Sequence, residues 1–127
     1  MYQLGALVLS ASCGGGGYDE IRTQVFTPSC AQQSCHGESG SGGLFLDDKA
    51  YENLVGQPPY DEEALADGLK RVAPFDPAKS LLLIKLTPPV DPRYGVLMPK
   101  GRTDAEPLEE DKREMIKAWI EAGAPKE

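Results

Sequence analysis

The residues with the most reactive chemistry stand together in one short stretch, SCAQQSCHG, at residues 29–37. Two thiols, Cys30 and Cys35, are separated by four residues, and His36, the only histidine of the chain, follows at once. Thiolates are nucleophiles and metal ligands, and the imidazole is the commonest metal ligand in proteins. The stretch therefore predicts a bound metal or cofactor, or a disulfide across a short loop.

A Cys-His pair that closes a two-cysteine stretch is the pattern of haem c attachment. The two thiols add to the vinyl groups on one edge of the porphyrin, and the next residue is held beneath the ring, where its imidazole reaches the iron. Two alternatives stay open: a Cys30–Cys35 disulfide in a haem-free interaction module, and a zinc site that includes His36. Zinc is disfavoured because the adjacent Cys35 and His36 converge poorly on one small ion. A thiol-redox enzyme is disfavoured because the short Cys-x-x-Cys is absent.

Around this stretch the sequence resembles the class I cytochrome c family, especially small bacterial haem domains, over roughly residues 20–124. The resemblance rests on Phe26, Cys30, Cys35-His36-Gly37, Gly43-Leu44, Arg71-Val72-Ala73-Pro74, Met98-Pro99 and Trp119-Ile120. The family usually has two residues between the cysteines, whereas this chain has four, so Ala31 to Ser34 would loop outward. The resemblance implies an all-α, small, loop-rich, cytochrome c-like fold with about four short helices around one haem.

The resemblance also implies the iron ligands and the activity. Cys30 and Cys35 would hold one covalent haem c, His36 would be the proximal ligand, and Met98, in the late loop GVLMPKG, would be the second ligand. A His/Met pair raises the reduction potential of haem iron, and two filled axial positions favour outer-sphere electron transfer over oxygen or peroxide chemistry. We therefore expect a monohaem electron carrier rather than an enzyme. If Met98 does not bind iron, the alternative is a haem sensor or a peroxidase-like domain.

The N-terminal segment resembles a bacterial lipoprotein signal. Its first twelve residues carry no charge and are mainly apolar, and Cys13 and four glycines follow. The resemblance implies a lipid on Cys13, with residues 1–17 forming a signal and tether before a haem domain at 18–127, and a periplasmic or membrane-anchored location. Three cysteines cannot all pair with one another. Thioethers at Cys30 and Cys35 and a lipid on Cys13 would account for all three.

The composition limits the partners. A formal net charge of −7 argues against nucleic acid, which demands a basic face. A redox partner protein would therefore be basic at its docking face, and contact with a membrane would occur only through the lipid. The chain has 14 glycines and 11 prolines, which predicts a loop-rich domain whose core a large cofactor would help to build. Arg71 and Arg102 are candidate partners for the haem propionates.

Apolar periodicity and helix breakers predict four helices. The first helix covers 18–30 and is limited by Pro28, and the second is a brief helix that contains Tyr51 and is capped by Asp47 or Asp48. The third covers 77–86 and is capped by Asp76. The fourth covers 108–122 and is ended by Gly123. We expect 77–86 to be buried, with a buried strand as the alternative, and residues 57–68 to be a surface loop. The last helix should turn Leu108, Ile116, Trp119 and Ile120 inward, with Trp119 packed on the first helix near Phe26.

Overall fold

The structure, a computed structural model, describes residues 17–30, 46 and 49–127. Its helices are α2 (Tyr18–Ile21), η2 (a π-helix, Arg22–Cys30), α3 (Ala50–Leu54), α4 (Glu62–Ala66), η4 (3₁₀, Pro77–Lys79), α5 (Leu81–Leu86), η5 (3₁₀, Pro92–Tyr94) and α6 (Glu110–Glu121). The described residues contain no β-strand, which confirms the predicted all-α class. Among these helices, none combines the length and apolar character that a membrane span requires.

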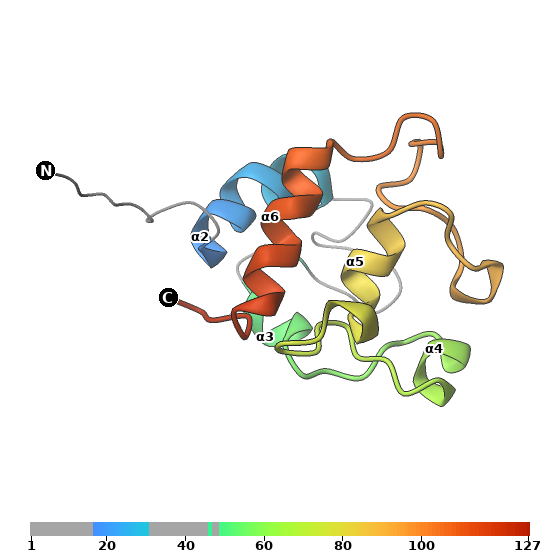
Figure 1. Ribbon diagram of the computed structural model, residues 1–127, viewed down its shortest axis with the longest axis horizontal. Helices are drawn as coiled ribbons and strands as arrows, with labels where there is room; N and C mark the ends of the chain where they lie inside the picture. Colours follow the sequence, from blue (N-terminus) through green and yellow to red (C-terminus); the bar gives the residue numbers. More distant parts are fainter. Residues whose placement is uncertain (1–16, 31–45, 47–48) are drawn as a thin grey trace, which may run out of the picture.

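One apolar cluster joins the two ends of the described chain. α6 lies between α2 and α5 and contacts both (Figure 1). Ile116, Trp119 and Ile120 on α6 are buried, as is Leu108 just before it. These residues confirm the predicted inward face, although α6 itself begins at Glu110 rather than at 108. Because α6 buries one stripe against two neighbours, it is the central element of the core.

Aromatic side chains fill the part of this cluster between α2 and α6. Trp119 packs against Tyr18 of α2, with ring centroids 5.7 Å apart, and against Tyr51 of α3 at 6.4 Å. The indole Nε1–H donates to the Pro125 carbonyl at 2.8 Å, so its polar atom is paired although the ring is buried. The predicted packing of Trp119 on the first helix is confirmed, with Tyr18 as the ring partner. Tyr18 in turn meets Phe26 edge-on.

α6 ends where the sequence predicts, at Gly123. This glycine has φ of 100°, a left-handed conformation that glycine adopts without steric cost. Its N–H donates to the Ile120 carbonyl at 2.9 Å, and the next N–H, of Ala124, donates to the Trp119 carbonyl at 2.9 Å, which is the Schellman arrangement. A Cβ at position 123 would also lie 2.6 Å from Cζ of Phe75. Glycine is therefore needed at position 123 for two reasons: it adopts the left-handed backbone conformation without steric cost, and it has no Cβ that would collide with Phe75.

We expect Gly123→Ala to lower the free energy of unfolding by about 1–3 kcal/mol, because alanine disfavours this φ and its methyl group meets the Phe75 ring. Urea denaturation would measure the loss. Gly56→Ala is the matched control, since Gly56 has φ of 75° and no atom within 4 Å of its added Cβ. The Gly123 loss should exceed the Gly56 loss, and equal losses would contradict the role given to Phe75.

The first predicted helix is present but changes geometry along its length. α2 passes into the π-helix η2, which contains Pro28 and continues to Cys30. The expectation that Pro28 limits the run before Cys30 is therefore wrong. In an α-helix the Pro28 ring would collide with the carbonyl of Gln24, four residues earlier, and the wider π turn relieves this clash. Cys30, the last residue of this helix, is buried in the core.

The apolar run predicted as one helix over 77–86 is divided at Ser80 into η4 and α5. Ser80 is extended, with φ of −99° and ψ of 106°, and is fully buried. Its hydroxyl accepts from the Ala73 N–H at 2.8 Å and donates to the Asp76 carbonyl at 2.9 Å. Asp76 makes no side-chain cap, contrary to prediction. The apolar run is divided at Ser80 because the hydroxyl of this buried serine is hydrogen-bonded to the preceding loop.

α5 is less buried than the sequence predicts. Leu86 is fully buried, whereas the four residues from 81 to 84 are half-buried. A helix of six residues, five of them apolar, can turn only part of its surface to the core. Leu82 and Leu83 pack against the core cluster. The expected burial is wrong for these residues, and so is the strand alternative.

An extended stretch at 70–72 is hydrogen-bonded to α3 on one side and to α5 on the other. On one side, the Val72 N–H donates to the Leu54 carbonyl at 3.1 Å. On the other, the Leu82 N–H donates to the Arg71 carbonyl at 2.9 Å. Only isolated bridges result, Val55 with Val72 and Lys70 with Ser80. These backbone bonds determine where α5 starts and how it faces the core.

Of two smaller predictions, one differs from the structure and one is confirmed. Residues 57–68 contain the helix α4 rather than a loop alone, begun by Asp61, whose carboxylate accepts from the Ala64 N–H at 2.9 Å. The acidic first turn suits the helix dipole, so the signal was present in the sequence. The brief helix with Tyr51 is confirmed as α3, which starts after Lys49. Its predicted caps, Asp47 and Asp48, lie outside the described residues.

Candidate functional site

The structure describes two of the five predicted site residues, Cys30 and Met98. The other three, Cys13, Cys35 and His36, lie outside the described residues. The Cys-His stretch is therefore described only at its first cysteine, whereas Met98 is described together with the whole loop that carries it.

Cys30 is the last residue of η2, and only 8% of its surface is exposed. It belongs to the apolar core cluster, together with Val25 and Phe26 of the same helix. A thiol at this place is held by a packed helix rather than by a loop. Anything bonded to Cys30 would therefore be attached at a defined point beside the core.

Met98 lies in the loop between η5 and α6 and is half-buried. Its side chain packs against the same core cluster that contains Cys30. Its backbone N–H donates to the Lys85 carbonyl of α5 at 2.8 Å. The loop therefore presents the Met98 thioether to the apolar core.

Cys30 and Met98 share one apolar cluster with residues of α5. Leu82 and Leu83 of α5 are half-buried and, like Met98, pack against this cluster. A porphyrin needs such apolar walls, a thiol for each vinyl group and nitrogen or thioether ligands for iron. The described residues supply the walls, one thiol in Cys30 and one thioether in Met98.

The described part of the chain does not test the zinc and disulfide alternatives. Within residues 17–30, 46 and 49–127, no group of three or more His, Cys, Asp and Glu side chains could hold a metal ion. The zinc alternative and the Cys30–Cys35 disulfide both need residues outside this part of the chain, so they stay alternatives.

The two predicted propionate partners, Arg71 and Arg102, also make contacts within the protein. A guanidinium N–H of Arg71 donates to the Asn53 carbonyl at 2.9 Å, and partial burial lowers the pKa of Arg71. Arg102 donates to the Pro107 carbonyl and forms an ion pair with Glu109, both at 3.2 Å. Both arginines therefore brace the chain, Arg71 beside α3 and Arg102 before α6.

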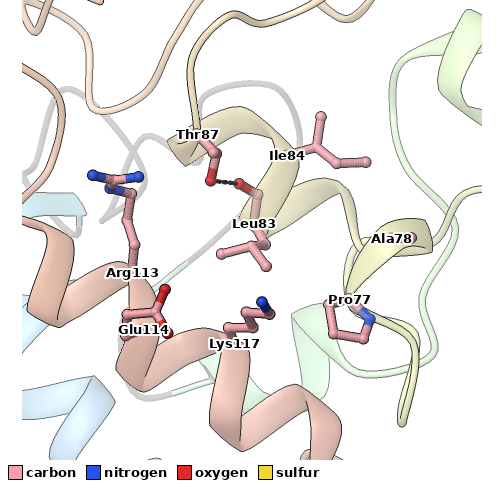
Figure 2. A pocket seen from close by; sticks show the side chains of 8 residues that line it. All are labelled: Pro77, Ala78, Leu83, Ile84, Thr87, Arg113, Glu114 and Lys117. Carbon is pink, nitrogen blue, oxygen red and sulfur yellow. Dashed lines mark hydrogen bonds between the residues drawn. The ribbon is translucent and has the colours of Figure 1, made fainter. Parts of the chain in front are cut away.

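A pocket of about 320 Å³ opens between α5 and α6 (Figure 2). It is lined by Pro77, Ala78, Leu83, Ile84, Thr87, Arg113, Glu114 and Lys117. The α5 side is apolar and the α6 side is charged. Neither Cys30 nor Met98 lines it, whereas Leu83, which also packs against the core cluster, does.

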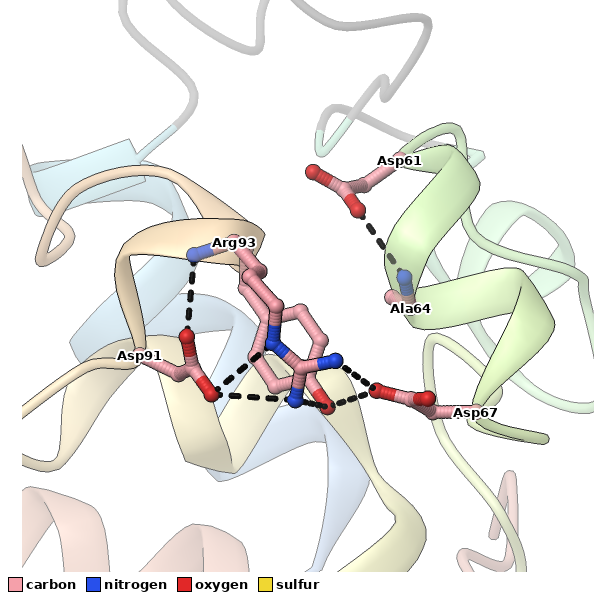
Figure 3. Close-up of polar contacts among 6 residues, drawn as sticks. Asp61, Ala64, Asp67, Asp91 and Arg93 are labelled. Carbon is pink, nitrogen blue, oxygen red and sulfur yellow. Dashed lines mark hydrogen bonds and ion pairs between the residues drawn. The ribbon is translucent and has the colours of Figure 1, made fainter.

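A polar network joins α4 to η5 (Figure 3). The Tyr94 hydroxyl donates to the Asp67 carboxylate at 2.5 Å, which raises the pKa of Tyr94. Arg93 forms ion pairs with Asp67 at 3.2 Å and with Asp91 at 3.0 Å. Hydrogen bonds from Arg93 lower the pKa of Asp91. Sequence reasoning missed this network, because Asp67 lies more than twenty residues before Arg93 and Tyr94 and no local pattern connects them.

Comparison with known proteins adds no relative. No protein-family model, curated protein sequence or solved structure shows a significant match to this chain.

Proposed function

We propose that this chain is an exported monohaem c-type cytochrome with a cytochrome c-like fold, which carries single electrons and catalyses no reaction of its own. One haem c would be bonded to Cys30 and Cys35, with His36 and Met98 as the iron ligands. The observation that carries the proposal is the arrangement of sulfur atoms. Cys30 is buried in the apolar cluster against which Met98 packs, although the two residues are 68 positions apart in the sequence.

The chain's own residues would perform three tasks around the cofactor. Haem, when bound, supplies a one-electron iron couple. Cys30, at the end of a packed helix, would keep the attachment edge in place. Met98 would occupy an axial position, which favours ferrous iron and excludes small molecules. Leu82 and Leu83 would exclude water, so that a change of charge at iron requires little solvent reorganisation.

The location and partner follow from charge and from the N-terminal residues. We propose export with a lipid on Cys13, because an apolar run, a cysteine and a glycine tether occur in that order. A net charge of −7 suits a redox partner with a basic docking face.

The test is covalent attachment in protein matured by haem-attachment machinery. Denaturing gels stained for haem peroxidase activity should show a band at the size of the chain. His36→Ala should remove stable low-spin haem, because the chain has no other histidine. Cys30→Ser together with Cys35→Ser should remove the stained band. Cys13→Ser is the matched control, and exported protein carrying it should stain as strongly as the parent.

An unstained band from fully matured protein would contradict the cytochrome assignment. Mass measurement after thiol alkylation would then separate the alternatives. Alkylation-resistant Cys30 and Cys35 that become reactive after reduction would favour the haem-free interaction module.

A further inference from the structure

Lys85 of α5 contacts the loop that carries Met98 at two points. Its backbone carbonyl accepts from the Met98 N–H at 2.8 Å, and its Nζ donates to the Tyr94 carbonyl at 2.7 Å. One residue of the helix thus bonds to both ends of the five-residue segment 94–98. The side chain is half-buried, and burial lowers the pKa of Lys85, an effect that the nearby Asp61 opposes.

Gly95 makes the contact with the ammonium group feasible. It has φ of 97°, and a Cβ built there would lie 2.8 Å from Nζ of Lys85. Any other residue at this position would strain the backbone and displace the ammonium group from the Tyr94 carbonyl. The glycine and the lysine therefore act as a pair.

The same loop is anchored on its outer side by α4. Asp67, the C-cap residue of α4, accepts from the Tyr94 hydroxyl at 2.5 Å and forms an ion pair with Arg93 at 3.2 Å (Figure 3). Tyr94 is thus held at its hydroxyl by Asp67 and at its carbonyl by Lys85. These bonds connect α4, η5 and α5 in one continuous path that ends at the Met98 backbone.

We propose that Lys85 is the positioning residue for the axial methionine: its ammonium group and its backbone carbonyl together hold the 94–98 segment so that the Met98 sulfur stays in reach of iron. The inference rests on the proposed function. A loop rich in glycine and proline has little secondary structure of its own, and such segments open locally at low free-energy cost. Ligands of metals are kept in place by the groups that hold them. Without the ammonium contact, the Tyr94 carbonyl would lose the donor that links it to α5.

The experiment compares Lys85→Met with Lys79→Met in haem-loaded protein. Lys79 is exposed, and no hydrogen bond or ion pair of its side chain is recorded among the described residues, so it controls for the loss of one positive charge. Two measurements are made: the weak near-infrared charge-transfer band of thioether-ligated ferric haem, and hydrogen exchange at the Met98 amide. The Val72 amide, bonded to Leu54 away from the loop, reports global unfolding.

Lys85→Met should speed exchange at Met98 on the order of tenfold, as expected for loss of one charged hydrogen bond, with no change at Val72. The near-infrared band should weaken, and Lys79→Met should alter neither measurement. Unchanged Met98 exchange in Lys85→Met would overturn the inference, whatever the band does. If wild type lacks the band while Lys85→Met still speeds exchange, the loop is held but Met98 is no ligand, and the proposed His/Met ligation fails with the positioning role.

If Lys85→Met speeds amide hydrogen exchange throughout the protein, including at Val72, Gly95→Ala is the variant that tests the inference. This variant retains Lys85 but displaces its ammonium group from the Tyr94 carbonyl. Faster exchange at Met98 and a weaker near-infrared band would support the inference, and an unchanged band with unchanged exchange would overturn it.

Discussion

Replacing Trp119 by alanine is expected to lower the free energy of unfolding by about 3–5 kcal/mol. The indole is 1% exposed and lies against Tyr18 and Tyr51, so its removal would leave a cavity where three helices meet. The carbonyl of Pro125 would also lose its donor, Nε1–H. Urea denaturation followed by far-UV circular dichroism would measure the loss, since the tryptophan fluorescence disappears with the residue.

Two variants separate the causes of this loss. Trp119→Phe keeps an aromatic ring but removes the bond to Pro125, and its loss should be clearly smaller than that of Trp119→Ala. Glu114→Ala, at an exposed position of the same helix, should change stability by no more than about 0.5 kcal/mol. A loss well under 1 kcal/mol for Trp119→Ala would show that the core has been assigned to the wrong face of α6.

Replacing Met98 by alanine is expected to change the redox chemistry more than any other single substitution outside the Cys-His stretch. Without the thioether, the sixth iron position would open, so ferrous protein should bind carbon monoxide readily. The reduction potential should fall by on the order of 0.1 V, within the range of about 0.8 V that axial ligands span. The near-infrared charge-transfer band should vanish. Absorption spectroscopy with a redox titration would measure all three changes.

Two controls test whether the sulfur of Met98, rather than its bulk, is responsible. Met98→Leu keeps a side chain of similar volume and should lose the band just as Met98→Ala does. Met115→Leu removes the thioether of α6, which packs against the core cluster, and should keep the band. If wild type already binds carbon monoxide and lacks the band, Met98 is not a ligand, and a haem sensor or peroxidase-like domain becomes the better assignment.

Local patterns allowed the prediction of those parts of the fold in which neighbouring residues decide the outcome. The spacing of Ile116, Trp119 and Ile120 predicted the buried face of α6, because apolar residues three and four apart share one side of a helix. Gly123 predicted the helix end, because its left-handed backbone is a property of the residue itself. The cap of α4 at Asp61 was equally local, and the polar composition of its surroundings obscured it.

For the candidate site, too, local sequence predicted one part and could not predict the other. Residue types and order indicated Cys30, Cys35, His36 and Met98, because attachment and ligation depend on thiols, imidazole and thioether at particular places along the chain. Nothing in that order indicates what holds the methionine. Lys85 looks in sequence like a cation at the end of an apolar run, and its contacts with Tyr94 and Met98 arise only when the loop folds back on α5.

By itself, then, the sequence determined the helical class, the packed face and end of α6, and the chemistry to expect of the Cys-His stretch. Tertiary structure alone decided the division of the apolar run at Ser80, the half-exposure of Leu81 to Ile84 and the anchoring of the Met98 loop. The physical reason is the range of the interactions involved. Helix periodicity and capping act within a few residues, whereas the Ser80 hydroxyl, Lys85 and Asp67 bond to groups brought near by the whole packing.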